Sequence, residues 1–134
     1  MIVADTNLLI YLYITGLRTG EAEAVLRKDP AWAAPLLWRS EFRNTLIGLE
    51  RHQEIRLDDV RIIVAEAEQW MGGREYSVVS QQVIQLAKES GCSAYDCEFV
   101  SLAMDLGLPL VTADRQILRA FPHVAITPKL FVQS

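Results

Sequence analysis

Short apolar segments that alternate with longer helical patterns are the feature that most constrains the fold of this chain. Strands are expected at residues 2–4, 31–34, 76–79, 110–112 and 124–126. Helices are expected at residues 8–13, 21–28, 36–52, 57–71, 80–90 and 93–105, with a short one from residue 115. Such an alternation forms βαβ units around a parallel sheet. We therefore predict an α/β fold: a single three-layer domain over residues 1–134, with a central parallel sheet of about four to five strands flanked by helices.

Two consecutive helices in this pattern are strongly amphipathic. The helix expected at residues 36–52 carries an apolar stripe of Trp38, Phe42 and Leu46, at the spacing of one helix face. The helix expected at residues 57–71 repeats the pattern, and Gly72 follows it. The two helices are expected to pack as an antiparallel pair.

Composition and charge exclude several classes of protein. The chain is 51% hydrophobic and 22% charged, which is typical of a globular domain and not of a disordered one. The longest apolar run covers residues 8–14, far short of the ~20 residues that span a membrane. No export signal is visible, so a cytoplasmic protein without a membrane partner is expected. A net charge of −4 argues against a nucleic-acid binder that relies on a broad basic face.

The cysteines and histidines do not form a recognisable metal motif. Cys92 and Cys97 are the only cysteines, and their spacing fits no zinc site. Cys97 is expected to be a small core residue. His52 and His123 are isolated in the sequence and are expected at the surface.

Four carboxylates stand at positions that favour a shared site. Asp5 and Asp114 each follow an expected strand, and Asp96 lies at the start of an expected helix. Glu41 lies beside the apolar stripe of its helix. In an open α/β sheet, ligands bind in the crevice beyond the carboxyl ends of the strands.

Each of these acids also has a purely structural explanation. Asp5 and Asp114 are suited to capping the helices that follow them. Asp96 completes a capping box with Ser93. Glu41 has the sequence environment of an ordinary solvated helix charge. Considered singly, these explanations are favoured, and only the joint placement of the four acids weakens them.

Carboxylates gathered at one rim repel one another and lose hydration, so they need a compensating cation. A set of carboxylate oxygens suits Mg²⁺ or Mn²⁺, and such a site can activate water for attack on a phosphodiester. Thr6, Asn7 and Thr112 are expected at the same rim, where they would hydrogen-bond to the metal ligands.

Three arginines are candidates for guiding RNA to this site. Arg39 and Arg43 flank Glu41 at i, i+4 spacing, and Arg115 follows Asp114. Without the four proposed ligands, the chain has equal numbers of acidic and basic residues. A local basic rim is therefore possible, although a solvated helix face explains the arginines equally well.

Four segments in order resemble the PIN domain, and more narrowly the ribonuclease toxins of the VapC type from prokaryotic toxin–antitoxin pairs. They are Ile2–Asn7, Ser40-Glu41, Ser93–Cys97 and Leu108–Asp114. The resemblance implies a metal-dependent endoribonuclease in which Asp5, Glu41, Asp96 and Asp114 hold Mg²⁺ or Mn²⁺. It also implies that Thr112 lies beside the metal. Asn7 occupies a position that varies in the family, and Glu98 is expected to point away from the site.

The resemblance further implies a homodimer and a small antitoxin that blocks the site. The exposed parts of the helices at residues 36–52 and 57–70 are the expected groove for the antitoxin, although their apolar stripes are more readily explained as core. A catalytically silent PIN-like module that binds RNA or protein is the alternative. A phosphoacceptor receiver or an aspartyl phosphatase is disfavoured, because Asn7 and Ser80 stand where those proteins need acids.

Overall fold

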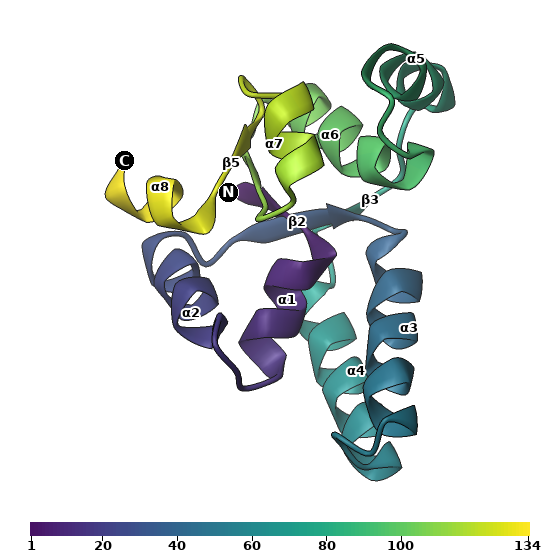
Figure 1. The fold of residues 1–134 in the computed structure, drawn as a ribbon, viewed down its shortest axis with the longest axis vertical. Helices are drawn as coiled ribbons and strands as arrows, with labels where there is room; N and C mark the ends of the chain where they lie inside the picture. The colour runs from purple at the N-terminus through teal and green to yellow at the C-terminus, as the bar shows by residue number, and fades with distance from the viewer.

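A five-stranded parallel sheet forms the centre of the computed structural model, which describes residues 1–134 (Figure 1). The strands are β1 (Ile2–Ala4), β2 (Trp32–Pro35), β3 (Glu75–Tyr76), β4 (Leu110–Val111) and β5 (Ala125–Ile126). Their order in the sheet is β3-β2-β1-β4-β5, and every pairing is parallel. The predicted α/β fold with a parallel sheet is confirmed.

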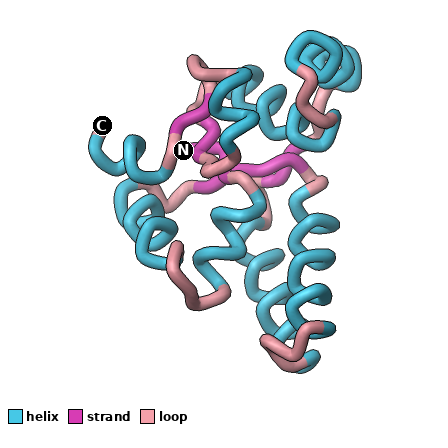
Figure 2. Tube along the Cα trace, viewed as in Figure 1, coloured by secondary structure: helices cyan, strands magenta, loops and turns pink.

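Helices cover both faces of the sheet. They are α1 (Thr6–Tyr13), α2 (Thr19–Lys28), α3 (Trp38–Arg51), α4 (Leu57–Met71), α5 (Ser80–Ser90), α6 (Ala94–Leu106), α7 (Arg115–Ala120) and α8 (Pro128–Gln133). In Figure 1, α1 to α4 lie on one side of the sheet and α5 to α7 on the other. Figure 2 shows the same three layers, with the strands running between the two groups of helices. None of the eight helices combines the length and apolar character needed for a membrane crossing.

Strand β1 is the centre of the hydrophobic core. Ile2, Val3 and Ala4 are all fully buried, because β1 pairs with β2 on one side and β4 on the other while helices cover both faces. An unbroken apolar run is what a strand in this position requires.

Helices α3 and α4 form the antiparallel pair that their sequences predict, extending together away from the sheet (Figure 1). The stripe residues Trp38, Phe42 and Leu46 are buried in the core. The apolar stripe of α3 is therefore mainly core, as expected.

Two elements differ from the expectation. The strand predicted at residues 76–79 is displaced and shorter, because only Glu75 and Tyr76 pair with β2. Val79 is exposed and precedes α5. The sequence analysis missed α8, although its start has a clear signal: the Thr127 hydroxyl accepts a 3.1 Å hydrogen bond from the Leu130 amide, and Pro128 opens the helix.

The cysteines and histidines lie where the sequence suggested. Cys97 is fully buried, Cys92 is nearly so, and both are free thiols. His52 and His123 are exposed.

The strand order creates a crevice at one place in the sheet. The chain moves outward from β1 to β2 and β3, and then continues on the other side of β1 with β4 and β5. The carboxyl ends of β1 and β4 therefore flank the point at which the order reverses, which is where open α/β sheets bind ligands. Asp5 follows β1 directly, and Asp114 follows β4 after a short turn.

Candidate active site

A small polar pocket lies at this reversal point. Its volume is about 120 Å³, and no hydrophobic residue lines it. The lining residues are Asp5, Thr6, Asn7, Glu41, Thr45, Asp96 and Asp114. The structure thus brings together all four acids singled out in the sequence, from four segments far apart along the chain. A larger cavity, of about 690 Å³, is lined mainly by hydrophobic residues and lies elsewhere.

Asp5 is held by hydrogen bonds to both its backbone and its side chain. Its amide donates a 3.2 Å hydrogen bond to the Val111 carbonyl, which fixes its backbone against β4. Its Oδ2 atom accepts a 2.7 Å hydrogen bond from the Thr112 hydroxyl. Burial raises the pKa of Asp5, and the charges of Asp96 and Asp114 raise it further, although the Thr112 hydrogen bond opposes them. Asp5 stands at the N-cap of α1 without making a side-chain cap, so capping does not explain its carboxylate.

Glu41 reaches the pocket from the first turn of α3. Its Oε1 atom accepts a 2.7 Å hydrogen bond from the Thr6 hydroxyl at the start of α1. Burial raises the pKa of Glu41 despite this bond, and the charges of Asp5, Asp96 and Glu98 raise it further. Glu41 is therefore not a freely solvated helix charge.

Asp96 and Asp114 complete the acidic lining from the starts of α6 and α7. Ser93 caps α6 by accepting a 3.0 Å hydrogen bond from the Asp96 amide. The Asp96 side chain faces the pocket, where burial and the charge of Asp114 raise its pKa. Asp114 does cap α7, since its Oδ1 atom accepts a 3.0 Å hydrogen bond from the Ile117 amide. Its own amide donates a 3.0 Å hydrogen bond to the Thr112 hydroxyl.

The expected supporting residues occupy the same rim. Thr6 and Thr112 are almost fully buried, and each hydroxyl donates to one acid of the pocket. Asn7 lines the pocket and is exposed. The two threonines hold Asp5 and Glu41 in fixed orientations.

No basic side chain balances the four acids. The six ion pairs of the structure all involve other carboxylates. Carboxylates that repel one another and are buried without a counter-charge are stabilised by protonation or by a bound cation. The donor set fits a hard divalent cation, because it consists of carboxylate and hydroxyl oxygens. No group of three acidic side chains lies close enough together to hold a metal ion directly. The match between the pocket and a divalent cation therefore rests on the chemistry of its oxygen donors.

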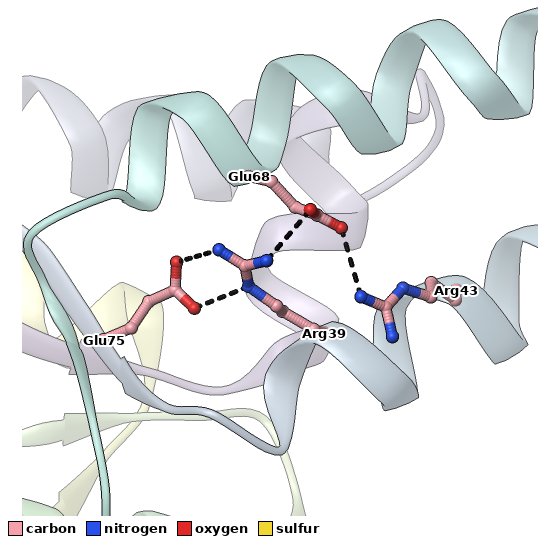
Figure 3. A network of polar contacts seen from close by, with 4 residues as sticks. All are labelled: Arg39, Arg43, Glu68 and Glu75. Carbon is pink, nitrogen blue, oxygen red and sulfur yellow. Dashed lines mark hydrogen bonds and ion pairs between the residues drawn. The ribbon is translucent and has the colours of Figure 1, made fainter.

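Two of the three candidate RNA-binding arginines have other partners. Arg39 makes a two-pronged ion pair with Glu75, at 2.7 and 2.8 Å, and contacts Glu68 at 3.0 Å (Figure 3). Arg43 contacts Glu68 at 3.4 Å. Neither arginine lines the acidic pocket. Their placement on α3 therefore gives no support to the predicted RNA-binding role. Arg115 is exposed and outside every ion pair, and its role stays a prediction.

Sequence reasoning missed one residue that lines the pocket. Thr45 lines it one helical turn after Glu41, and i, i+4 spacing on the predicted helix was the available signal. Glu98 was expected to point away. It does not line the pocket, yet its charge reaches Glu41 and raises the pKa of that residue.

A comparison with family models matches the PIN domain over residues 2–123. The chain belongs to the PIN domain family. The resemblance in the four sequence segments is therefore confirmed, and the acidic pocket lies where those segments meet in this PIN domain.

Individual relatives of this PIN domain match along nearly the whole chain. Ribonuclease VapC3 of Pyrobaculum aerophilum is 27% identical over 130 residues, which cover 95% of this chain and 98% of the relative. The crystal structure of PAE2754 from the same organism has a TM-score of 0.78 at 20% identity, covering 98% of this chain and 93% of the other. A toxin–antitoxin complex from Klebsiella pneumoniae contains a chain with a TM-score of 0.68 at 19% identity, with coverage of 96% and 98%. The structural matches establish the shared fold.

Proposed function

We propose that this PIN domain is a metal-dependent endoribonuclease in which Asp5, Glu41, Asp96 and Asp114 hold Mg²⁺ or Mn²⁺. One observation carries the proposal: carboxylates from four separate elements line one small pocket that contains no basic side chain. The similarity to ribonuclease VapC3 supports RNA as the substrate.

In such a site, the acids would hold the metal ion and the two threonines would orient the acids. The chemistry that a divalent cation supplies when bound is activation of a water molecule and stabilisation of negative charge on the phosphate. Thr112 orients Asp5, and Thr6 orients Glu41, through hydrogen bonds of 2.7 Å each. The raised pKa values of Asp5, Glu41 and Asp96 show that their charged forms are disfavoured in the metal-free protein. Cation binding therefore competes with protons at these groups.

Substitution of single ligands tests the proposal. Asp5→Asn and Asp96→Asn keep the size of each side chain while removing its charge. Each variant is expected to lose Mg²⁺-dependent cleavage of RNA and to bind Mn²⁺ more weakly in calorimetry. Asp105→Asn, on the exposed last turn of α6, is the matched control. Full cleavage by either site variant would remove that residue from the proposed ligands.

We further propose that the chain is the toxin of a type II toxin–antitoxin pair. The structural match to a toxin–antitoxin complex supports this role. A groove of about 460 Å³ runs between α3 and α4 and offers a surface for the antitoxin. Its lining combines polar and apolar side chains: Ser40, Arg43, Asn44, Ile47, Val60 and Val64. Co-purification of a small protein, encoded beside the gene, that inhibits cleavage tests the role.

The remaining features of the proposal are a homodimer, a cytoplasmic location and a single domain over residues 1–134. Light scattering on the purified protein tests the dimer. A mass corresponding to one chain of 15.1 kDa would refute it.

The alternative function is a catalytically silent PIN-like module that binds RNA or protein. The observation in its favour is that no three acids are already arranged to hold a metal. Calorimetry separates the two functions. The absence of Mg²⁺ and Mn²⁺ binding at neutral pH would favour the silent module, whereas binding that Asp5→Asn abolishes would favour the nuclease.

A further inference from the structure

We propose that Arg39 is a positioning residue for Glu41: its ion pairs with Glu75 and Glu68 hold the first turn of α3 so that Glu41 points into the acidic pocket. This inference rests on the proposed nuclease function, because it concerns one of the proposed metal ligands. Arg39 itself lies outside the pocket and touches none of the four acids.

Arg39 joins three elements through one guanidinium group (Figure 3). Its Nε and Nη2 atoms donate to the two carboxylate oxygens of Glu75 on β3, at 2.7 and 2.8 Å. Its Nη1 atom donates to Glu68 on α4 at 3.0 Å. Arg43 extends the network from the next turn of α3 to the second oxygen of Glu68, at 3.4 Å. A guanidinium that makes a two-pronged bond fixes direction as well as distance.

The position of Arg39 on the helix explains why Glu41 depends on it. Two residues correspond to a rotation of about 200° around an α-helix, so Arg39 and Glu41 leave opposite sides of the same turn. Glu41 is bonded to Thr6 of α1 on one side, and Arg39 is bonded to β3 and α4 on the other. The first turn of α3 is thus held from both sides.

Helix α3 lacks a side-chain N-cap, which is the usual means of fixing the start of a helix. Leu37, the residue at the N-cap, makes no side-chain cap. The amide of Leu36 instead donates a 3.0 Å hydrogen bond to the carbonyl of Tyr76, which ties the approach to α3 to β3. The Arg39–Glu75 ion pair adds a second connection between the first turn of α3 and β3.

Burial distinguishes this ion pair from an ordinary surface pair. The Glu75 side chain is only 8% exposed. Hydrogen bonding to Arg39 is the largest cause that lowers the pKa of Glu75 and raises that of Arg39. The indole nitrogen of Trp38 is buried and lies close enough to lower the pKa of Glu75, although it is outside normal hydrogen-bond geometry. A buried carboxylate depends strongly on its partner, so loss of Arg39 would rearrange the start of α3.

The test uses the whole 134-residue chain and four variants of it. Arg39→Gln removes the charge, whereas Arg39→Lys keeps the charge without the two-pronged geometry. Glu75→Gln weakens the same contact from the other side. Arg61→Gln is the matched control, because Arg61 pairs with Asp58 at 3.4 Å on the exposed face of α4. Each protein is measured for Mn²⁺ affinity, for kcat and KM on single-stranded RNA, and for amide exchange at Glu41.

The expected result for Arg39→Gln is a loss of about 10-fold in Mn²⁺ affinity and in kcat, the size typical of residues that orient metal ligands. KM should be unchanged, amide exchange at Glu41 should accelerate, and Arg39→Lys should recover part of each loss. Arg61→Gln should match the wild type. If Arg39→Gln does not fold, the same changes are expected for Glu75→Gln.

The inference is overturned if a folded Arg39→Gln or Glu75→Gln variant retains Mn²⁺ affinity, kcat and amide exchange at Glu41 within about twofold of the wild type. A wild-type protein that neither binds Mn²⁺ nor cleaves RNA would refute the proposed function instead. In that case the amide exchange at Glu41 still decides whether Arg39 positions it.

Discussion

The Thr112 hydroxyl donates a 2.7 Å hydrogen bond to Asp5 although 107 positions separate the two residues. Thr112 follows β4 and Asp5 follows β1, so the bond crosses the reversal point of the sheet. The same hydroxyl accepts a 3.0 Å hydrogen bond from the amide of Asp114. One buried side chain therefore links two of the four acids.

Thr112→Val should weaken metal binding, because valine keeps the shape of the side chain but removes both the donor to Asp5 and the acceptor for the Asp114 amide. The pKa of Asp5 should rise further, since the Thr112 bond lowers it. We expect Mn²⁺ affinity and cleavage to fall about 10-fold, measured by calorimetry and by RNA hydrolysis.

Two further variants act as controls for this bond. Thr112→Ser retains the hydroxyl and should remain close to the wild type. Thr45→Val changes a pocket residue that makes no hydrogen bond to the acids and should have a smaller effect than Thr112→Val. Equal effects of the two valine variants would mean that pocket polarity, and not the bond to Asp5, is what matters.

The sequence predicted the placement of Asp5 and Asp114 because strand ends in a parallel sheet obey a topological rule. It predicted Glu41 less directly, since helical periodicity places a residue on a face but does not say what that face meets. The ion-pair partners of Arg39 could not be predicted from the sequence for the same reason. Glu68 and Glu75 lie on α4 and β3, and tertiary packing decides how these elements approach α3. The strand at Glu75 was misplaced because a two-residue edge strand carries almost no periodic signal.

The metal-free protein should be less stable at neutral than at mildly acidic pH. Asp5, Glu41 and Asp96 have pKa values raised above their ordinary values of 3.8 and 4.5. The folded state then binds protons more tightly than the unfolded state, so stability is full below these ordinary values and declines as the pH rises through the folded values. The pKa values of Asp29 and Glu75 are lowered instead. The stability that these two residues contribute is lost only at lower pH, as the pH falls through their folded pKa values.

Thermal unfolding in a chelator measures this dependence. The Tm should be higher at about pH 5 than at about pH 7.5. In a small domain, each kcal/mol of unfolding free energy changes the Tm by roughly 2–8 °C. Mg²⁺ should raise the Tm mainly at the higher pH, where the carboxylates are charged. Asp5→Asn should flatten the pH profile. A Tm that is higher at neutral pH without metal would contradict the pKa directions of these acids.

Glu41 and Glu98 offer a direct contrast between a pocket acid and a nearby acid. Glu41 lines the pocket, whereas Glu98 acts on it only through its charge. Glu41→Gln should reduce cleavage by more than about 100-fold, beyond the range for residues that only support a ligand. Glu98→Gln should lower the pKa of Glu41 and change cleavage by less than about 10-fold. A larger loss for Glu98→Gln would move it into the ligand set.

Arg115 is the remaining candidate for a contact with RNA phosphate. It is exposed, takes part in no ion pair and follows Asp114 at the start of α7. Arg115→Gln should raise KM for single-stranded RNA at unchanged kcat, and the salt dependence of binding should fall by about 0.7 in its logarithmic slope, as expected for one lost phosphate contact. Arg119→Gln, one turn further along α7 and also exposed, is the matched control. If both variants have the same salt slope as the wild type, the RNA approaches the acidic pocket without α7, and the predicted role of Arg115 is wrong.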